Sequence, residues 1–326
     1  MQKSQPLVSI IVPVYNAGPY LRQRIESLIG QSLQEIEIIF VLDSPDDGSD
    51  QMVQDYAQRD NRIKVIVNKG NLHTGLSRNA GLSVAGGDYV AFADHDDFCE
   101  PEMYEKLYRK AKEKQSDIVF CDMCFEKKDV APVSKIYFKE PEEKVRERIL
   151  EELLKGNGFY YSILNHLYRL TFLREHDIQF IDTRQITLED RYFNLLAYHY
   201  ARKVTYIPGE YIHHVLYRGS TQHTYAFKSL IPMVNHLEMM CLFFRKHPEY
   251  EAIFRENFGA DAIRKLYNSF LPEIRYKFPV YAFRMLGRIK EKSALREALK
   301  RFGERRQWRE LPLKLKCFYG LLRLFS

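Results

Sequence analysis

Residues 8–42, VSIIVPVYNAGPYLRQRIESLIGQSLQEIEIIFVL, decide the fold because two strand patterns flank one helix pattern. Both ends of this stretch, 8–14 and 36–42, are short runs rich in Val and Ile, which favour strands. Between them, the apolar residues of 20–29 recur at helical spacing. Because a helix that joins two strands is a crossover connection, the stretch predicts two parallel, neighbouring strands.

The same alternation continues outward to about residue 125. Further strand patterns lie at 63–67, 88–94 and 117–121, and further helix patterns at 52–57 and 100–114. Strands that alternate with helices are typical of a mostly parallel sheet with helices on both faces. The sequence therefore predicts an α/β fold with a central sheet.

The alternation of strand and helix patterns ends after residue 126. Residues 127–145 are charged and contain two prolines, which predicts a loop-rich insertion. Helix patterns then dominate, at 142–154, at 188–200 and over most of 230–322. No run of about 18 apolar residues occurs, so no membrane-spanning helix is predicted.

Charge is distributed unevenly along the 326 residues. The segment 284–326 holds 13 Lys/Arg and 4 Asp/Glu, a net charge of +9, so the rest of the chain carries 6 − 9 = −3. A basic end on a mildly acidic body suggests an anionic partner, although a solvated helix face has the same composition. No nucleic-acid-binding module accompanies the charge, so an anionic membrane surface is the predicted partner and nucleic acid is not.

Cysteine usage and the polar start of the chain predict a cytoplasmic protein. The five cysteines are an odd number, and residues 1–6 lack the apolar core of a signal peptide. Cys121 and Cys124 have no second Cys pair, which favours packing over a zinc site.

Polar residues cluster where the predicted strands end, at 15–18, 43–50 and 94–97. Ligands bind at the carboxyl ends of parallel strands, so these clusters predict one site. Asp94 and Asp96, two residues apart, lie on one side if the chain stays extended, and their oxygens suit Mg²⁺ or Mn²⁺. The alternative is a structural turn in which the neighbouring Asp97 caps the next helix.

Several of these segments together resemble family 2 glycosyltransferases, inverting enzymes of the GT-A fold. The similar segments are 8–16, 46–49, 77–82, 87–92, 94–97 and 187–193. The segment 94–97, Asp-His-Asp-Asp, falls where that family carries its DxD motif, and the resemblance extends over about residues 7–225. It implies a Rossmann-like catalytic domain at 1–225. The remaining residues, 226–326, form a region that their own pattern and charge predict to be helical and basic.

The resemblance also implies roles for individual residues. The nucleotide-sugar donor would be bound by Pro13, Tyr15, Asn16, Asp43, Asp46, Arg78, Asn79, Asp94, His95 and Asp96. Mn²⁺ or Mg²⁺ would be held by Asp96 and Asp94, with His214 as a further candidate ligand. Asp190 would be the catalytic base, and Glu189 and His166 would lie on the acceptor side.

The sequence departs from the family pattern at three places, and each departure affects one of the implied roles. Asp43 directly follows its strand, as in the family, but Ser44 and Pro45 come before Asp46, so both carboxylates are candidates for the uracil contact. His95 stands where small residues are usual, and we expect it to point away from the metal. The Gln-x-x-Arg-Trp motif of processive synthases is absent, which favours addition of one sugar per acceptor.

The predicted activity is therefore transfer of a sugar, from a UDP-sugar by resemblance, to a glycan or lipid-linked acceptor in bacterial surface-polysaccharide assembly. The basic region would either attach peripherally to the inner face of the cell membrane or pack as helices on the rest of the protein. Two alternatives stay open. One is a sugar nucleotidyltransferase, for which 15–19 is not the expected Gly-rich basic loop. The other is a catalytically inactive module that binds nucleotide sugars.

Overall fold

The structure, a computed structural model, describes most of the chain. It covers residues 5–127, 130–135, 144–156, 162–216, 230–258, 262–267, 289, 291–303 and 318. The chain forms two compact units. The first comprises Met1–Leu150, Tyr161–Asp182 and Phe193–Tyr217, and the second comprises Glu151–Tyr160, Thr183–Tyr192 and Arg218–Ser326.

The first unit is built on one sheet, which has nine strands in the described residues. They are β1 (Val8–Val14), β2 (Ile36–Leu42), β3 (Ile63–Val67), β4 (Tyr89–Phe92), β5 (Phe98–Cys99), β6 (Ile118–Lys127), β7 (Val130–Lys135), β8 (His166–Arg169) and β9 (Val204–Leu216). Their order in the sheet is β3-β2-β1-β4-β8-β6-β9-β5, and β7 pairs with β6.

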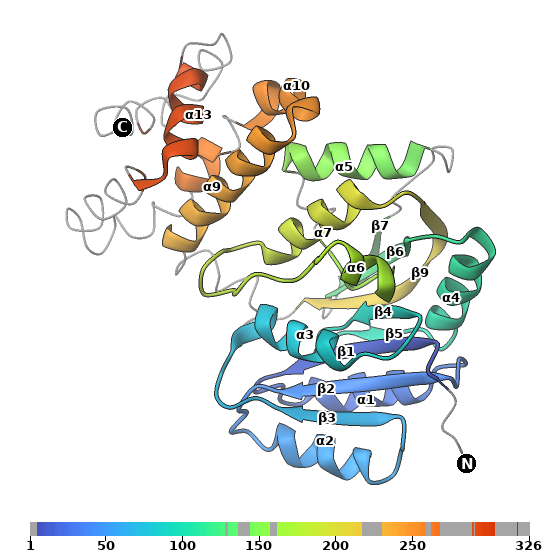
Figure 1. Cartoon of the computed structure of the whole chain (residues 1–326). Helices are drawn as coiled ribbons and strands as arrows, with labels where there is room; N and C mark the ends of the chain where they lie inside the picture. Colours follow the sequence, from blue (N-terminus) through green and yellow to red (C-terminus); the bar gives the residue numbers. More distant parts are fainter. Residues whose placement is uncertain are drawn as a thin grey trace. The chain divides into compact units, whose positions relative to one another are not determined.

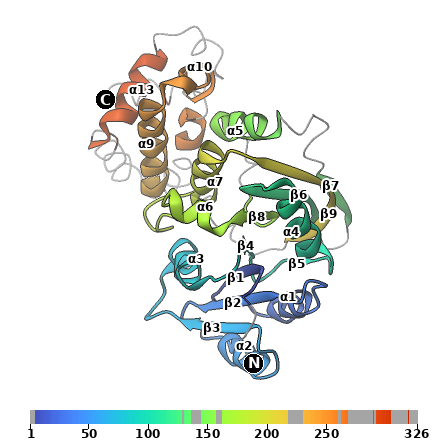
Figure 2. The ribbon, with the colours of Figure 1, turned by 45° about the vertical axis from the view of Figure 1, so that its right-hand side comes forward.

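The half of the sheet from β3 to β4 is parallel, as the sequence predicts. Three helices connect its strands: α1 (Tyr20–Ile29), α2 (Ser49–Ala57) and α3 (His73–Val84). In Figure 1, β1, β2 and β3 lie side by side, and Figure 2 shows α1 and α3 on opposite sides of them. Every residue of β1 and β2 is buried, because helices cover both faces of these strands.

The other half of the sheet is mixed and was not predicted. β8 runs antiparallel to β4 and β6, while β9 runs parallel to β6. The prediction of a loop-rich insertion at 127–145 is wrong for its first residues, because β6 continues to Lys127 and β7 pairs with it antiparallel. Within the described residues β7 pairs with β6 alone, and such an edge strand tolerates its proline.

Most of the remaining helices follow the predicted pattern, but the helix at Leu170–Glu175 was not predicted. They are α4 (Met103–Lys114), α5 (Val145–Lys155), α6 (Leu170–Glu175), α7 (Glu189–Tyr200), α9 (Leu230–Lys246), α10 (Glu251–Ile253) and α13 (Ser293–Gly303), with two short turns at Pro248–Tyr250 and Phe254–Phe258. None of the helices within the described residues is long and apolar enough to cross a bilayer. The domain boundary after residue 225 stays a prediction, since 217–229 lie outside the described residues.

Aromatic rings fill the core of the first unit next to β4. The ring of Phe92 meets those of Phe180 and Phe193 edge to face, at centroid distances of 4.9 and 5.4 Å. Phe180 and Phe193 stack on each other at 4.1 Å. These contacts fix β4, and hence the loop that follows it, against the segment before α7.

Candidate active site

The acidic loop, residues 94–97, follows β4 at the carboxyl edge of the parallel strands. It lies beside the end of β1, where the strand order reverses direction. Side-chain oxygens of Asp94, Asp96 and Asp97 all lie within 4.8 Å of one another. The structure thus brings together the carboxylates that the sequence assigns to one site, at the position where doubly wound sheets bind ligands.

Asp94 is held from two sides by arginines. Nη2 of Arg78, on α3, donates to Oδ1 of Asp94 at 2.9 Å, and Nε of Arg24, on α1, donates to the Asp94 carbonyl at 3.0 Å. Burial opposes ionisation of Asp94, but Arg78, then His95 and, more weakly, His214 hold the pKa of its carboxyl below the usual value. Asp94 is therefore an ionised carboxylate in a fixed position.

Asp97 anchors the acidic loop to β9. Its carboxylate accepts from the backbone N–H of Val215 at 3.0 Å and pairs with Nδ1 of His214 at 3.0 Å. The alternative that Asp97 caps the next helix is wrong, because the N-cap position of α4 is Glu102. Burial lowers the pKa of His214, but Asp97, Asp94 and Asp96 raise it overall. The Nδ1 atom of this candidate metal ligand thus faces Asp97.

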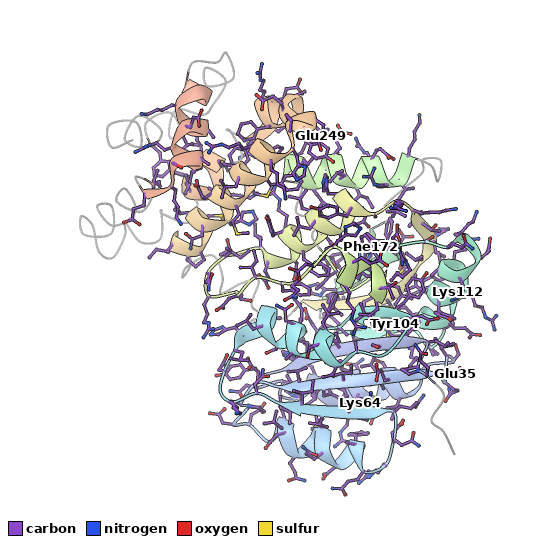
Figure 3. The ribbon with its side chains drawn as sticks, viewed as in Figure 1. Glu35, Lys64, Tyr104, Lys112, Phe172 and Glu249 are labelled. Atoms are coloured by element: carbon purple, nitrogen blue, oxygen red, sulfur yellow. The ribbon has the colours of Figure 1, made fainter. Side chains whose placement is uncertain are left out.

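Arg24 is a residue of the site that the sequence analysis missed. Its side chain is fully buried on α1, next to Cys99 and the buried Tyr104, which is labelled in Figure 3. Burial opposes its charge, yet the neighbouring groups, among them Asp97 and Asp94, hold the pKa of Arg24 above its ordinary value. A signal was present in the sequence, because Arg24 falls on the apolar face of its helix with Leu21 and Leu28.

The loops that follow β1 and β2 bind each other. Asn16 and Asp46 exchange two hydrogen bonds, one from Nδ2 of Asn16 at 2.7 Å and one from the Asp46 N–H at 2.9 Å. The Gly18 N–H donates to Asp47 at 2.9 Å. Pro13 is buried in β1, whereas Tyr15, two residues on, is 47% exposed. Tyr15 and the two paired loops follow β1 and β2, so they lie at the same carboxyl edge of the sheet as the acidic loop.

Asp43, the first candidate for the uracil contact, is 3% exposed. Its oxygens accept hydrogen bonds from Asn68, from the Leu72 N–H and from the His73 N–H, at 2.7 to 2.8 Å. Asp43 therefore fixes the start of α3, the helix that carries Arg78. Asp46, the second candidate, is exposed.

Two predicted site residues bond to other groups of the protein, Asn79 at a half-buried position and His166 in the core. Asn79 exchanges hydrogen bonds with the backbone of Phe180 at 2.7 and 2.9 Å. His166 is 3% exposed, and its ring nitrogens bond Asn165 and Tyr198 at 2.9 and 2.8 Å. Burial lowers the pKa of His166 to about 3, so this imidazole is neutral at physiological pH. An acceptor could reach it only if the core opened.

In the second unit, Glu189 and Asp190 begin α7. The residue before them, Leu188, has a φ of +59°, which is rare for a bulky side chain and typical of functional sites. Arg191 is fully buried and donates from Nε and Nη2 to the Leu153 carbonyl at 3.1 and 2.9 Å. The first turn of α7 is thus anchored at the end of α5.

The residues of the acidic loop fit a divalent metal. Carboxylate oxygens are the ligands that Mg²⁺ and Mn²⁺ prefer, and three of them converge here. Three nearby carboxylates repel one another unless cations offset them. Arg78 and His214 each pair with one of them, Asp94 and Asp97. Asp96 and Asp94 stay the predicted metal ligands.

Comparisons with known proteins agree with this geometry. The model of the glycosyl transferase family 2 matches residues 9–177. EpsH of Bacillus subtilis is 32% identical over 229 residues, which cover 68% of this chain and 64% of EpsH. The poly(ribitol-phosphate) beta-glucosyltransferase of Bacillus spizizenii is 29% identical over 66% of this chain and 33% of its own length. The chain thus spans less than two thirds of the length of these relatives.

Solved structures share the fold. The TarS 1–349 fragment of S. aureus, in a structure with UDP-GlcNAc, has a TM-score of 0.63 at 21% identity and covers 98% of this chain and 88% of its own. A mannosyltransferase of Pyrobaculum calidifontis, in a structure with GDP-Man and Mn²⁺, has a TM-score of 0.53 at 12% identity and covers 98% of this chain and 86% of its own.

The match over half of the chain shows that this protein belongs to glycosyl transferase family 2. Its fold is the GT-A fold, an α/β sheet with flanking helices. The family and the fold predicted from the sequence are both confirmed.

Proposed function

We propose that this protein is an inverting glycosyltransferase that moves a sugar from a nucleoside-diphosphate sugar to a hydroxyl group of its acceptor. Asp96 and Asp94 would hold Mn²⁺ or Mg²⁺ with the donor, and Asp190 would be the base. The observation that carries the proposal is the convergence of three carboxylates at the strand-order reversal of a family 2 fold.

The chain's own residues supply the remaining chemistry. Arg78 keeps Asp94 ionised and in place, and Arg24 holds the backbone of the same residue. The metal, when bound, would offset the charge that develops on the leaving diphosphate. The acceptor oxygen forms its bond to the anomeric carbon as the bond to the diphosphate breaks, and the hydroxyl proton passes to the Asp190 carboxylate. Glu189 would lie on the acceptor side.

For the donor we propose a UDP-sugar, bound between Tyr15 and the loops that carry Asn16, Asp43 and Asp46. Support comes from the TarS fragment, whose structure is a complex with UDP-GlcNAc. The acceptor would be a glycan or a lipid-linked acceptor in bacterial surface-polysaccharide assembly, in keeping with the relative named for poly(ribitol-phosphate). The basic residues of 284–326 would attract the chain to an anionic membrane surface, where such acceptors occur.

The proposal is tested by incubating the purified protein with a panel of nucleotide sugars and measuring nucleotide release, with Mn²⁺ and with excess EDTA. We expect release of a nucleoside diphosphate from one donor class, which increases with a glycan acceptor and stops in EDTA. Release of pyrophosphate from a nucleoside triphosphate and a sugar phosphate would indicate a nucleotidyltransferase instead. Donor binding without turnover under any condition would indicate an inactive binding module.

A further inference from the structure

A second cluster of metal-ligand side chains lies on β5, β6 and β9, separate from the acidic loop. His213 on β9 is the direct register partner of Cys124 on β6 and of Phe98 on β5. Register partners project from the same face of a sheet, so these three side chains form one row. Glu126, two residues after Cys124, joins the row on that face.

Both ring nitrogens of His213 face carboxylates. Nδ1 lies 2.9 Å from Oε1 of Glu126, and Nε2 lies 2.8 Å from Oε1 of Glu100. The ring stacks on Phe98 with a centroid distance of 4.4 Å and an interplanar angle of 3°, which fixes its orientation. Glu100 and Glu126 are thus both paired with the single imidazole of His213.

Cys124 adds a thiol to this pair of carboxylates. Its side chain is 2% exposed, and its strand position pairs it directly with His213. Two glutamates therefore contact one imidazole, and a buried thiol lies beside them. Such an excess of negative charge in a half-buried place is costly unless a cation offsets it.

We propose that Cys124, Glu126 and His213 bind a Zn²⁺ ion. Ligand atoms of these three residues lie within 4.8 Å of one another, and thiolate, carboxylate and imidazole are the ligands that zinc prefers. Nδ1 of His213 would bind the ion, while Nε2–H donates to Glu100, as carboxylates commonly orient a zinc-bound histidine. The Cys124 thiol would release its proton to solvent as the ion binds.

The sequence alone argues against this site, because Cys121 and Cys124 have no second Cys pair. Only strand pairing brings His213 to Cys124. The next residues of β9, His214 and Val215, bond Asp97, so the ion would also fix the strand that supports the acidic loop.

The site can be tested with Co²⁺, which reports a bound thiolate through a charge-transfer absorption band in the near ultraviolet. Chelator-treated protein without nucleotide is titrated with CoCl₂, and then with ZnCl₂ to displace the cobalt. We expect a band that saturates at about one equivalent and is lost on zinc addition. The Cys124→Ser variant should lack the band, and Cys121→Ser, on the same strand, should keep it.

Further variants separate this site from the acidic loop. Asp96→Ala should keep the band, because the acidic loop offers oxygen ligands and no sulfur. Glu126→Gln and His213→Gln should weaken cobalt affinity, and Glu100→Gln should weaken it by roughly 10- to 100-fold, the usual effect of losing an outer carboxylate.

Absence of the band in the wild-type protein at saturating Co²⁺ would overturn the proposal, and so would a band that survives Cys124→Ser. If Cys124→Ser does not fold, the affinities of Glu126→Gln and His213→Gln decide the question, and unchanged values contradict the site. Since the readout is sulfur ligation and not sugar transfer, the result is independent of the proposed activity.

Discussion

At the scale of single residues, the site depends on how each carboxylate of the acidic loop is compensated. Arg78 offsets Asp94 and His214 offsets Asp97. These two pairs hold the loop in place, and within it Asp96 and Asp94 are the proposed metal ligands.

The first prediction concerns Asp96. Replacement by Asn keeps the size of the side chain but removes the charge that binds the metal. We expect metal-dependent nucleotide release to fall at least 100-fold, a loss of about 2.7 kcal/mol in transition-state stabilisation, while the melting temperature stays close to wild type. The exposed Asp50→Asn is the matched control and should keep full activity. Wild-type activity that persists in excess EDTA would contradict the metal assignment.

The second prediction concerns Arg24, whose buried charge lies beside Asp94 and Asp97. Arg24→Met removes this positive charge, so we expect free Mn²⁺ to bind at least three-fold more tightly without nucleotide, because charge repulsion with the ion is lost. Turnover should fall, because the bond to the Asp94 carbonyl is lost as well. Manganese affinity is measured by electron paramagnetic resonance.

Two further variants serve as controls for Arg24→Met. Arg24→Lys keeps the charge and should bind Mn²⁺ nearly as the wild type does. Arg22→Met removes a charge from the exposed face of the same helix and should change neither quantity. Weaker manganese binding in Arg24→Met would show that the carbonyl bond outweighs the charge.

At the scale of elements, helix α7 and strand β8 each carry a residue whose role follows from its position. Asp190 lies in the first turn of α7, where its carboxylate could serve either as a base or as a partner of the helix dipole. The two roles differ in what they affect, namely rate or stability.

The third prediction separates these roles. Asp190→Asn cannot accept a proton, so we expect a rate loss of roughly 10²- to 10⁴-fold, with donor affinity within a few-fold of wild type. A purely structural role predicts instead a loss of about 0.3–1 kcal/mol in the free energy of unfolding with unchanged turnover. Turnover and the free energy of unfolding are measured on the same preparation. Independently of this variant, a wild-type product with retained anomeric configuration would refute the inverting mechanism.

The fourth prediction concerns His166 on β8, whose pKa is lowered to about 3 by burial. The folded state keeps this imidazole neutral, whereas the unfolded chain takes up a proton below about pH 6.5. The stability that His166 contributes is therefore complete above pH 6.5 and is lost as the pH falls towards 3. Near pH 4 the loss should reach about 3 kcal/mol.

The His166→Gln variant isolates this effect. It should be less stable than the wild type at pH 7, and the difference should narrow as the pH falls, measured by urea unfolding at each pH. A difference that stays constant between pH 7 and pH 4 would mean that His166 can be protonated in the folded state.

At the scale of the whole molecule, the segment 284–326 is strongly basic, whereas the rest of the chain is mildly acidic. Truncation after Glu304 removes six Lys/Arg and one Glu, a net change of −5. The removed basic residues are Arg305, Arg306, Arg309, Lys314, Lys316 and Arg323.

The fifth prediction is that the full chain sediments with anionic vesicles, more weakly as salt rises, and that the truncated chain stays in the supernatant. Activity on a short soluble acceptor should survive the truncation. Replacing Arg305, Arg306 and Arg309 by Gln keeps the chain length and should weaken vesicle binding in the same direction. Equal sedimentation of all three proteins would assign the binding to another surface, and an insoluble truncated chain would assign the segment to the core.

What the sequence by itself determined is the parallel half of the sheet and the acidic loop at its edge. Strand and helix periodicity in 8–42 depends on residues a few positions apart, so it can be recognised without knowledge of the fold. The position of Asp94 and Asp96 follows directly from the end of β4, which is also local. The prediction of a Rossmann-like architecture and of an acidic loop at the sheet edge therefore needed no long-range information.

Only the tertiary structure decided which side chains compensate these carboxylates and which strands complete the sheet. β8 is short and β9 has an irregular pattern, so neither is recognisable from its own sequence. Both form strands because they pair with neighbours, β8 with β4 and β9 with β6. The contacts of Arg24 with Asp94 and of His213 with Cys124 join residues distant in sequence, on different elements. Such contacts depend on strand register and helix packing, which no local pattern encodes.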